Sequence, residues 1–264
     1  MYNTIDLKNK NVLVTGGAQG IGEAICRAMA ACGANIMINH LHNDEKAKAL
    51  AEVLRIEFGI NAFSFQADIA DQNAIIKMFE YMDKTMQGID VLVNNAGCES
   101  VDHAVHLDIG EWDRVFNVNL RGSFICAQEA GRRMVNKKSG VIINISSIHD
   151  RVARKGLIHD CCSKAGMNMM AKCLALELGE HNIRVLAVSP GAIETDMNRK
   201  DINDFGREKF NQWIPLGRIG NVDEVAWTCA FLASDKASYI TGTEIYIDGA
   251  YKESTVPYDS RSKE

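Results

Sequence analysis

Seven short apolar runs recur along the 264-residue chain, and most of them are apolar throughout instead of alternating with polar residues. They cover residues 11–16, 34–39, 61–68, 89–97, 140–147, 183–191 and 243–249. Segments with helical spacing lie between them, at 20–32, 43–58, 71–87, 111–137, 157–180 and 222–234. Strands that are apolar on both faces need cover on both faces, and helices of this length supply it when the sheet is parallel. The pattern therefore predicts an α/β fold in which a doubly wound parallel sheet has helices on both faces.

No Pro-rich or Ser-rich linker, low-complexity tract or repeat of fixed period divides the chain, so we expect one domain over residues 1–264. One long irregular stretch, 195–215, lies between the sixth strand and the helix that begins near Asn221. Its place at the carboxyl end of a strand suits a substrate lid, and a purely structural helical excursion is the alternative. The C-terminal tail, 251–264, would either reach a neighbouring subunit or be frayed.

Composition favours small-molecule partners. The formal charge is -5, and the Lys and Arg residues are scattered, so there is no basic stripe for nucleic acid or for an anionic membrane surface. The first ten residues, MYNTIDLKNK, lack the apolar core of a signal peptide, and no run approaches the length of a membrane span. Eight cysteines form no C-x-x-C pair. We therefore expect a cytoplasmic protein with reduced thiols, no metal and no membrane segment.

A glycine-rich loop, VTGGAQGIG (14–22), joins the first strand to the first helix. Gly16, Gly20 and Gly22 lack Cβ atoms, so the backbone can approach a pyrophosphate at the positive end of a helix. The strand–turn–helix context makes this a dinucleotide-binding loop, in which Gln19 and Ile21 also lie.

The loop resembles the nucleotide motif of the short-chain dehydrogenase/reductase family. Three further motifs match in the right order, NNAG (94–97), NVNL (117–120) and SPGAIETDM (189–197), and AD at 67–68 occupies the usual adenine-contact position. The resemblance covers essentially the entire chain. It implies a Rossmann fold and an NAD- or NADP-dependent oxidoreductase that acts on an alcohol/carbonyl pair.

The resemblance also implies which residues hold the nucleotide. Those near the pyrophosphate, adenine, adenosine ribose and nicotinamide would be Gly16, Gln19, Gly20, Ile21, Gly22, Asn39, His40, Asp68, Ile69, Asn95, Ala96, Gly97, Lys164, Pro190, Gly191, Ile193 and Thr195. Asp68 could equally be a turn residue that caps the next helix.

The choice between NAD and NADP stays open. An acidic residue at the end of the second strand would bind the ribose 2′-hydroxyl of NAD, and a nearby Arg would accept the 2′-phosphate of NADP. Neither is in the expected place, because the chain has NHLHND at 39–44 and an uncharged Gln19 in the loop. Asn39 and His40 could serve either nucleotide.

The resemblance implies a catalytic set of Asn, Ser, Tyr and Lys. Asn119, Ser147 and Lys164 match three of these positions, and Asp160 occupies the fourth, where the family has its tyrosine acid/base. Lys164 follows Asp160 by four residues, one helical turn, so the alignment is firm. No tyrosine occurs between Tyr81 and Tyr239, so the tyrosine is absent rather than displaced.

The replacement changes the chemistry. A phenol titrates near pH ~10 and a neighbouring ammonium lowers it toward the working range, whereas a carboxyl starts near ~4 and is pushed lower still. We therefore expect Asp160 to be ionised, since protonating a carboxyl at pH 7 would cost roughly 4 kcal/mol. Its carboxylate also ends about 3 Å nearer the backbone than a Tyr hydroxyl would. A water could fill that gap.

Three functions remain open. In the first, Asp160 and Lys164 form an ion pair, and a water, His149, His159 or Cys161 serves as acid/base for hydride transfer. In the second, the protein is a nucleotide-binding relative, a sensor or partner subunit, that has lost dehydrogenase activity. In the third, Asp160 acts as a general base in a non-redox reaction.

Within the family the closer likeness is to bacterial glucose 1-dehydrogenases, carried by SSIHD (146–150), GLIH (156–159) and IPLGRIG (214–220). That likeness suggests a sugar, polyol or cyclic ketone as substrate. The family resemblance further implies a homotetramer built on the last strand and on the helices at 111–137 and 157–180.

Overall fold

The computed structural model describes residues 5–254 and contains one seven-stranded sheet of order β3-β2-β1-β4-β5-β6-β7, in which every described pairing is parallel. The strands are β1 (Asn11–Val14), β2 (Asn35–His40), β3 (Ala62–Gln66), β4 (Val91–Asn94), β5 (Gly140–Ile145), β6 (Ile183–Pro190) and β7 (Glu244–Ile247). Each lies within the apolar run predicted for it or differs by one residue. The predicted doubly wound fold is therefore confirmed.

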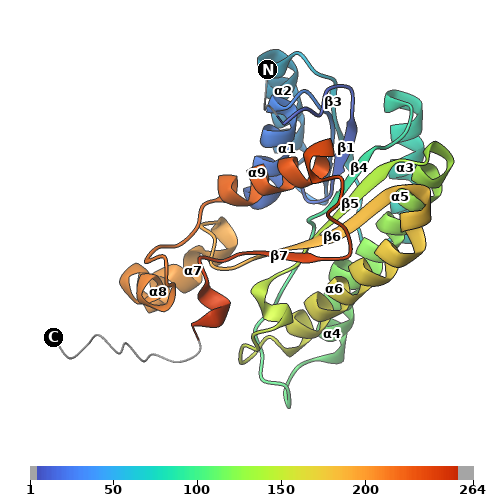
Figure 1. Cartoon of the computed structure of the whole chain (residues 1–264). Helices are drawn as coiled ribbons and strands as arrows, with labels where there is room; N and C mark the ends of the chain where they lie inside the picture. Colours follow the sequence, from blue (N-terminus) through green and yellow to red (C-terminus); the bar gives the residue numbers. More distant parts are fainter. Residues whose placement is uncertain (1–4, 255–264) are drawn as a thin grey trace.

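Three helices cover each face of the sheet (Figure 1). One face carries α1 (Gly20–Ala31), α2 (Asp44–Phe58) and α9 (Val222–Ala233), and the other carries α3 (Gln72–Met86), α5 (Ser123–Lys137) and α6 (Ile158–Leu178). A separate apolar cluster fills each interface, because strand side chains point alternately to the two faces.

The predicted helix over 111–137 is interrupted. Its first part is α4 (Ile109–Phe116), its last part is α5, and a π-helical turn, η1 (Asn117–Gly122), joins them. A Cβ at Gly122 would lie 2.3 Å from the carbonyl oxygen of Ile69, so the absent side chain lets the turn approach the loop after β3. Single π turns inside α-helices commonly mark functional sites, and this one carries Asn119.

The stretch 195–215 folds as two helices, α7 (Asp196–Phe205) and α8 (Arg207–Trp213). Ile202, Ile214 and Ile219 form a small apolar cluster of their own there, apart from the two main cores. The helical character of this stretch is thus settled, and its function as a substrate lid stays a prediction. The predicted tail lies outside the described residues beyond Ser254.

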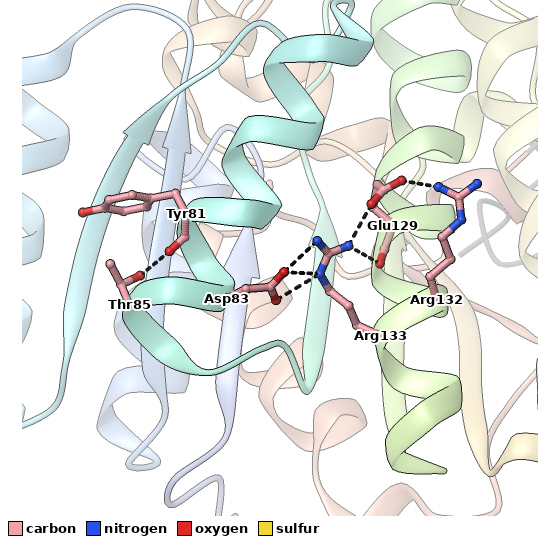
Figure 2. A network of polar contacts seen from close by, with 6 residues as sticks. All are labelled: Tyr81, Asp83, Thr85, Glu129, Arg132 and Arg133. Atoms are coloured by element: carbon pink, nitrogen blue, oxygen red, sulfur yellow. Dashed lines mark hydrogen bonds and ion pairs between the residues drawn. The ribbon is translucent and has the colours of Figure 1, made fainter.

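A polar network ties α3 to α5 on the outside of one face (Figure 2). The Arg133 guanidinium donates to both carboxylate oxygens of Asp83 on α3, with its closest contact at 2.8 Å, and to Glu129 one turn earlier on α5. The same guanidinium lies 5.0 Å from the ring centroid of Phe79, so it also covers the edge of the apolar core.

The sheet order places a topological switch point at β1, where neighbouring connections diverge. β1 pairs with β2 on one side and with β4 on the other. The connection that follows β1 and the connection that follows β4 therefore run in opposite directions along the sheet. Ligands of open α/β sheets bind at such a switch point. The glycine loop after β1 and the NNAG motif after β4 both lie at this edge.

Candidate active site

The conformation of the glycine loop requires glycine at three positions. Gly16 and Gly20 have left-handed φ values of 61° and 55°. A Cβ at Gly22 would lie 2.3 Å from the Gly16 carbonyl oxygen, which leaves no room for one. The loop opens α1, whose first turn offers free N–H groups and the positive end of the helix dipole. This cradle fits a dinucleotide pyrophosphate.

The NNAG motif is held against β1. The Thr15 hydroxyl oxygen accepts hydrogen bonds from the backbone N–H groups of Asn95 and Ala96, at 2.9 and 3.0 Å. The Asn95 side-chain amide donates to the Thr15 and Gly16 carbonyls. The Asn95 side chain therefore fixes the crevice wall, and Ala96 lies directly beside Gly16, whose added Cβ would meet its Cα at 3.0 Å.

The two residues proposed to meet the adenosine ribose have inward-facing side chains. Asn39 is 1% exposed, accepts from the Gly16 N–H at 3.2 Å and donates to the Ala67 carbonyl at 3.0 Å. His40 is also buried, with Nδ1 3.1 Å from the His42 carbonyl oxygen. The amide of Asn43 donates to Gln19, an uncharged bridge between the two loops.

At the adenine end, Asp68 caps the turn after β3. Its carboxylate accepts from the Ala70 N–H at 2.8 Å, so Asp68 is a turn residue, but it does not cap the next helix, because the N-cap of α3 is Asp71. Ile69 is buried, and its carbonyl oxygen is the atom that Gly122 approaches.

The loop after β6 closes the nucleotide crevice from the other side. Thr195 begins α7 as its N-cap, accepting from the Asn198 N–H at 3.3 Å, and its methyl group lies 3.8 Å from where a Gly20 Cβ would be. Pro190 ends β6, Ile193 is buried, and Gly191 runs so close to Asp248 that a Cβ would lie 2.6 Å from it. The glycine loop and the SPGAIETDM motif are thus brought together.

Asn119 connects the catalytic set. It is 1% exposed, and its amide nitrogen lies 3.2 Å from Asp160 Oδ1, 3.1 Å from Ser163 Oγ and 3.0 Å from the Cys98 carbonyl oxygen. Its Oδ1 accepts from the Cys98 N–H at 2.9 Å. Asn119 therefore joins the π turn, the NNAG loop and the first turns of α6.

Asp160 points inward. It is 4% exposed, lies in the first turn of α6, and directs Oδ1 at the Asn119 amide. The predicted contact ion pair with Lys164 is not formed in the described structure, where the Lys164 ammonium donates to the Ile145 carbonyl at 3.1 Å. Burial lowers the pKa of Lys164, and the Asp160 charge opposes that effect at longer range.

Ser147 follows β5 and lies two residues after Ile145, whose carbonyl accepts from Lys164. Its hydroxyl caps the short 3₁₀ helix η2 (Ile148–Asp150) by accepting from the His149 N–H at 3.1 Å. Gly97 borders the group, since its added Cβ would lie 3.4 Å from Asn119 Oδ1 and 3.6 Å from Lys164 Nζ.

The three side chains considered as substitute acids are differently placed. His159 is fully buried, with Nε2 2.9 Å from Ser100 Oγ, and His149 Nδ1 lies 2.9 Å from the Val152 carbonyl oxygen. Burial raises the pKa of the Cys161 thiol, which makes it a poor thiolate. All eight cysteines are free thiols.

Two partners were missed by sequence reasoning. Ser163 lies three residues after Asp160, on the same face of α6, and this spacing was the available signal for its contact with Asn119. Glu244 contacts Asp150 from 94 positions further along the chain, and no local pattern indicates that pairing.

The chain is similar to known proteins over most of its length. The family described as Enoyl-(Acyl carrier protein) reductase matches residues 16–252. A 3-oxoacyl-(acyl-carrier-protein) reductase, FabG, of Aquifex aeolicus is 38% identical over 245 residues, covering 93% of this chain and 98% of that protein. The 3beta-hydroxysteroid dehydrogenase 1 of Eggerthella lenta is 38% identical over 251 residues, covering 94% and 95%.

Among solved structures, a gluconate 5-dehydrogenase of Burkholderia cenocepacia in complex with NADP and tartrate superimposes with a TM-score of 0.90 at 31% identity, over 94% of this chain and 97% of that one. Within residues 5–254, no helix is both long and apolar enough to cross a membrane. The same residues hold no group of three or more His, Cys, Asp or Glu side chains suited to a metal ion.

Proposed function

The chain belongs to the short-chain dehydrogenase/reductase family, and from that membership we propose that it interconverts an alcohol and a carbonyl compound with Asp160 in place of the proton-donating tyrosine. Its relatives identify it as an NAD(P)-dependent oxidoreductase. The single observation that carries the proposal is the convergence of Asn119, Lys164 and Gly97 beside an intact glycine cradle. Only the acid/base differs from the family's set.

The nicotinamide supplies or accepts the hydride when it is bound. Lys164 would hold the ribose as an ammonium, and Ser147 would donate to the substrate oxygen. Asp160 is too short and accepts from Asn119, so the substrate oxygen would exchange its proton with solvent through a water in the volume that a phenol would fill.

We propose a sugar, polyol or cyclic ketone as substrate. Relatives that are named for a hydroxysteroid and for gluconate support a hydroxyl on a ring or on a polyol chain. The helices α7 and α8 would close over it, as the lid prediction requires.

NAD is the proposed nucleotide. The described side chains from Asn39 to Asn43 include no Lys or Arg, and Asp44 and Glu45 begin α2 directly beyond them. Two carboxylates near a ribose 2′-phosphate would repel it, whereas a 2′-hydroxyl carries no such cost.

A second function is favoured by the burial of Asp160. A carboxylate that is 4% exposed and hydrogen-bonded to Asn119 is suited to holding the site together without chemistry. The chain would then be a nucleotide-binding relative, a sensor or partner subunit. The general-base alternative is disfavoured by the same observations, because a carboxylate that is 4% exposed and accepts from Asn119 has little access to a substrate.

One experiment separates these functions. NADH or NADPH formation and consumption would be followed over a panel of sugars, polyols and cyclic ketones, for the wild type and Asp160→Tyr. Turnover by the wild type that Asp160→Tyr weakens or abolishes supports the altered mechanism. A silent wild type that gains activity with Asp160→Tyr supports the nucleotide-binding relative and overturns our first proposal.

We also propose a cytoplasmic homotetramer. Eight unpaired thiols suit a reducing compartment. Large apolar side chains are exposed on α6, at Met169 and Leu176, and on and after α9, at Trp227 and Tyr239. Two separate apolar faces are what a closed assembly with two kinds of contact would bury. Light scattering that gives the mass of one 29.1 kDa chain would contradict this.

A further inference from the structure

Two carboxyl groups that belong to no predicted site lie against each other behind Ser147. Asp150 ends η2, and Glu244 begins β7. The Asn168 amide nitrogen on α6 donates to Asp150 Oδ2 at 3.1 Å and also to Glu244 Oε2. The Ser189 hydroxyl donates to Glu244 Oε1 at 2.6 Å. Four elements, η2, α6, β6 and β7, thus meet at the two carboxyl groups.

The surroundings favour one proton on the pair. Burial and the adjacent Glu244 raise the pKa of Asp150 to about 7. Burial also acts on Glu244, but its hydrogen bonds with Asp150, Ser189 and Asn168 lower its pKa. Glu244 has the better donors, so Asp150 carries the proton.

Other charged and titratable groups around the pair leave this assignment in place. Tyr246 on β7 donates its hydroxyl to Asp150 Oδ1 at 3.3 Å, and burial raises the pKa of that phenol. Arg151 is exposed, and Lys164 acts on Asp150 only through space. Lys252 stacks on the Tyr246 ring, 4.4 Å from its centroid, and does not contact either carboxylate in the described contacts.

Asp150 is directly connected to the backbone that presents Ser147. The Asp150 N–H donates to the Ser147 carbonyl at 3.1 Å, and the His149 N–H between them donates to the Ser147 hydroxyl at 3.1 Å. A displacement of Asp150 therefore moves the cap of η2, which is Ser147 itself.

We propose that Asp150 and Glu244 share one proton, and that this proton ties η2 to β7 and α6 and so positions Ser147 for the substrate. Asp150 is in this sense a positioning residue. The effect on Ser147 and the substrate rests on the proposed function. The sharing of one proton between Asp150 and Glu244 does not depend on it.

The contribution of Asp150 to the stability of the folded protein depends on pH. Because the pKa of Asp150 in the folded protein lies above its ordinary value, the native state keeps a proton that the unfolded chain releases. The stabilisation is complete below pH ~4 and is lost as pH rises to about 7. Above that, two adjacent carboxylates repel, η2 loosens, and turnover falls.

The test compares the wild type with Glu244→Gln and Asp150→Asn, two isosteric changes whose amides donate without titrating. Glu57→Gln, at an exposed position on α2, is the control for a lost charge. Difference infrared spectra would follow the carbonyl band of a protonated carboxyl, and hydrogen exchange would follow residues 146–157, both between pH ~5.5 and ~8.5.

In the wild type and the control, we expect the band to disappear around pH 7 and the exchange of 146–157, corrected for its intrinsic rate, to rise by up to ~10-fold per pH unit until about pH 7 and to level off above it. In Asp150→Asn, the band should be missing and exchange should be flat, whereas in Glu244→Gln the band should disappear at lower pH than in the wild type, because burial alone then raises the pKa of Asp150. Neither variant should show an alkaline fall in kcat near pH 7. A missing band in the wild type, or the same exchange profile in the variants, overturns the inference. A wild type without turnover at any pH overturns the proposed function, while the spectra and the exchange still decide the shared proton.

Discussion

At the scale of single residues, the site depends on where Asp160 points. The family resemblance assigned Asn119, Ser147, Asp160 and Lys164 to one group, and sequence spacing added only that Lys164 lies one helical turn after Asp160 on α6. It was insufficient for orientation. The inward orientation of the Asp160 side chain depends on its contact with Asn119, 41 positions away. The ion pair considered between Asp160 and Lys164 is not formed, because the Lys164 ammonium donates to the Ile145 carbonyl instead.

Asp160→Asn should shift the pH dependence of nucleotide binding. Burial lowers the pKa of Lys164 and the Asp160 charge opposes this, so removing that charge lowers the pKa further. The amide oxygen can still accept from Asn119, so the geometry is kept. We expect the alkaline loss of NADH affinity to begin at lower pH than in the wild type.

Fluorescence titration of NADH between pH ~7 and ~10 measures this shift. Asp113→Asn, exposed on α4, serves as the matched control and should behave as the wild type. An identical profile for Asp160→Asn would show that the Lys164 charge is set by other groups.

At the scale of elements, sequence periodicity located the strands and most helices within a few residues, since these are local patterns. It missed the π turn at Asn117–Gly122, because α4 and α5 continue the same helical spacing on both sides of it. The turn arises from a close approach to Ile69, a tertiary contact that periodicity does not contain.

Gly122→Ala should destabilise the fold and the site together. Its Cβ would lie 2.3 Å from a backbone oxygen, which forces the turn outward at a cost of about 1–3 kcal/mol and moves Asn119. Urea unfolding and NADH binding measure the two effects.

Gly131→Ala is the control for this change. That glycine lies within α5, and its Cβ would meet only the Leu178 side chain at 3.6 Å. Ordinary helix propensity then predicts a gain of up to ~1 kcal/mol. A loss of the same size in both variants would mean that the close approach to Ile69 is unimportant.

Arg133→Met should weaken the contact between α3 and α5. Arg133 is 21% exposed and forms a bidentate pair with Asp83 plus a bond to Glu129, so we expect a loss of about 1–2 kcal/mol in the free energy of unfolding. Arg132→Met, at a side chain that is 63% exposed, should cost less than ~0.5 kcal/mol. Equal losses in urea unfolding would refute the structural role given to Arg133.

At the scale of the whole molecule, the alternation of strands and helices predicted a doubly wound sheet, and the right-handed crossover rule makes that outcome strongly favoured. The pairing of Asp150 with Glu244 was beyond such reasoning, because strand order brings β7 beside β6 and only side-chain geometry brings the two carboxyl groups into contact.

Nucleotide binding should raise the thermal stability of the entire chain. At a concentration about 100-fold above Kd, NADH would add about 2.7 kcal/mol and raise the Tm by about 5–10 °C. If Asp44 and Glu45 repel a 2′-phosphate, the same concentration of NADPH should raise it less. A larger shift with NADPH in thermal scans would reverse the proposed preference.

The place of β7 at the edge of the sheet also bears on how the protein is made. A ribosome delivers β1 to β6 first, and domains begin to fold during synthesis. Until Glu244 emerges, the polar partner shared by Asp150, Asn168 and Ser189 is not yet present. A nascent chain could therefore assemble its nucleotide crevice early, while the support behind Ser147 would be completed last.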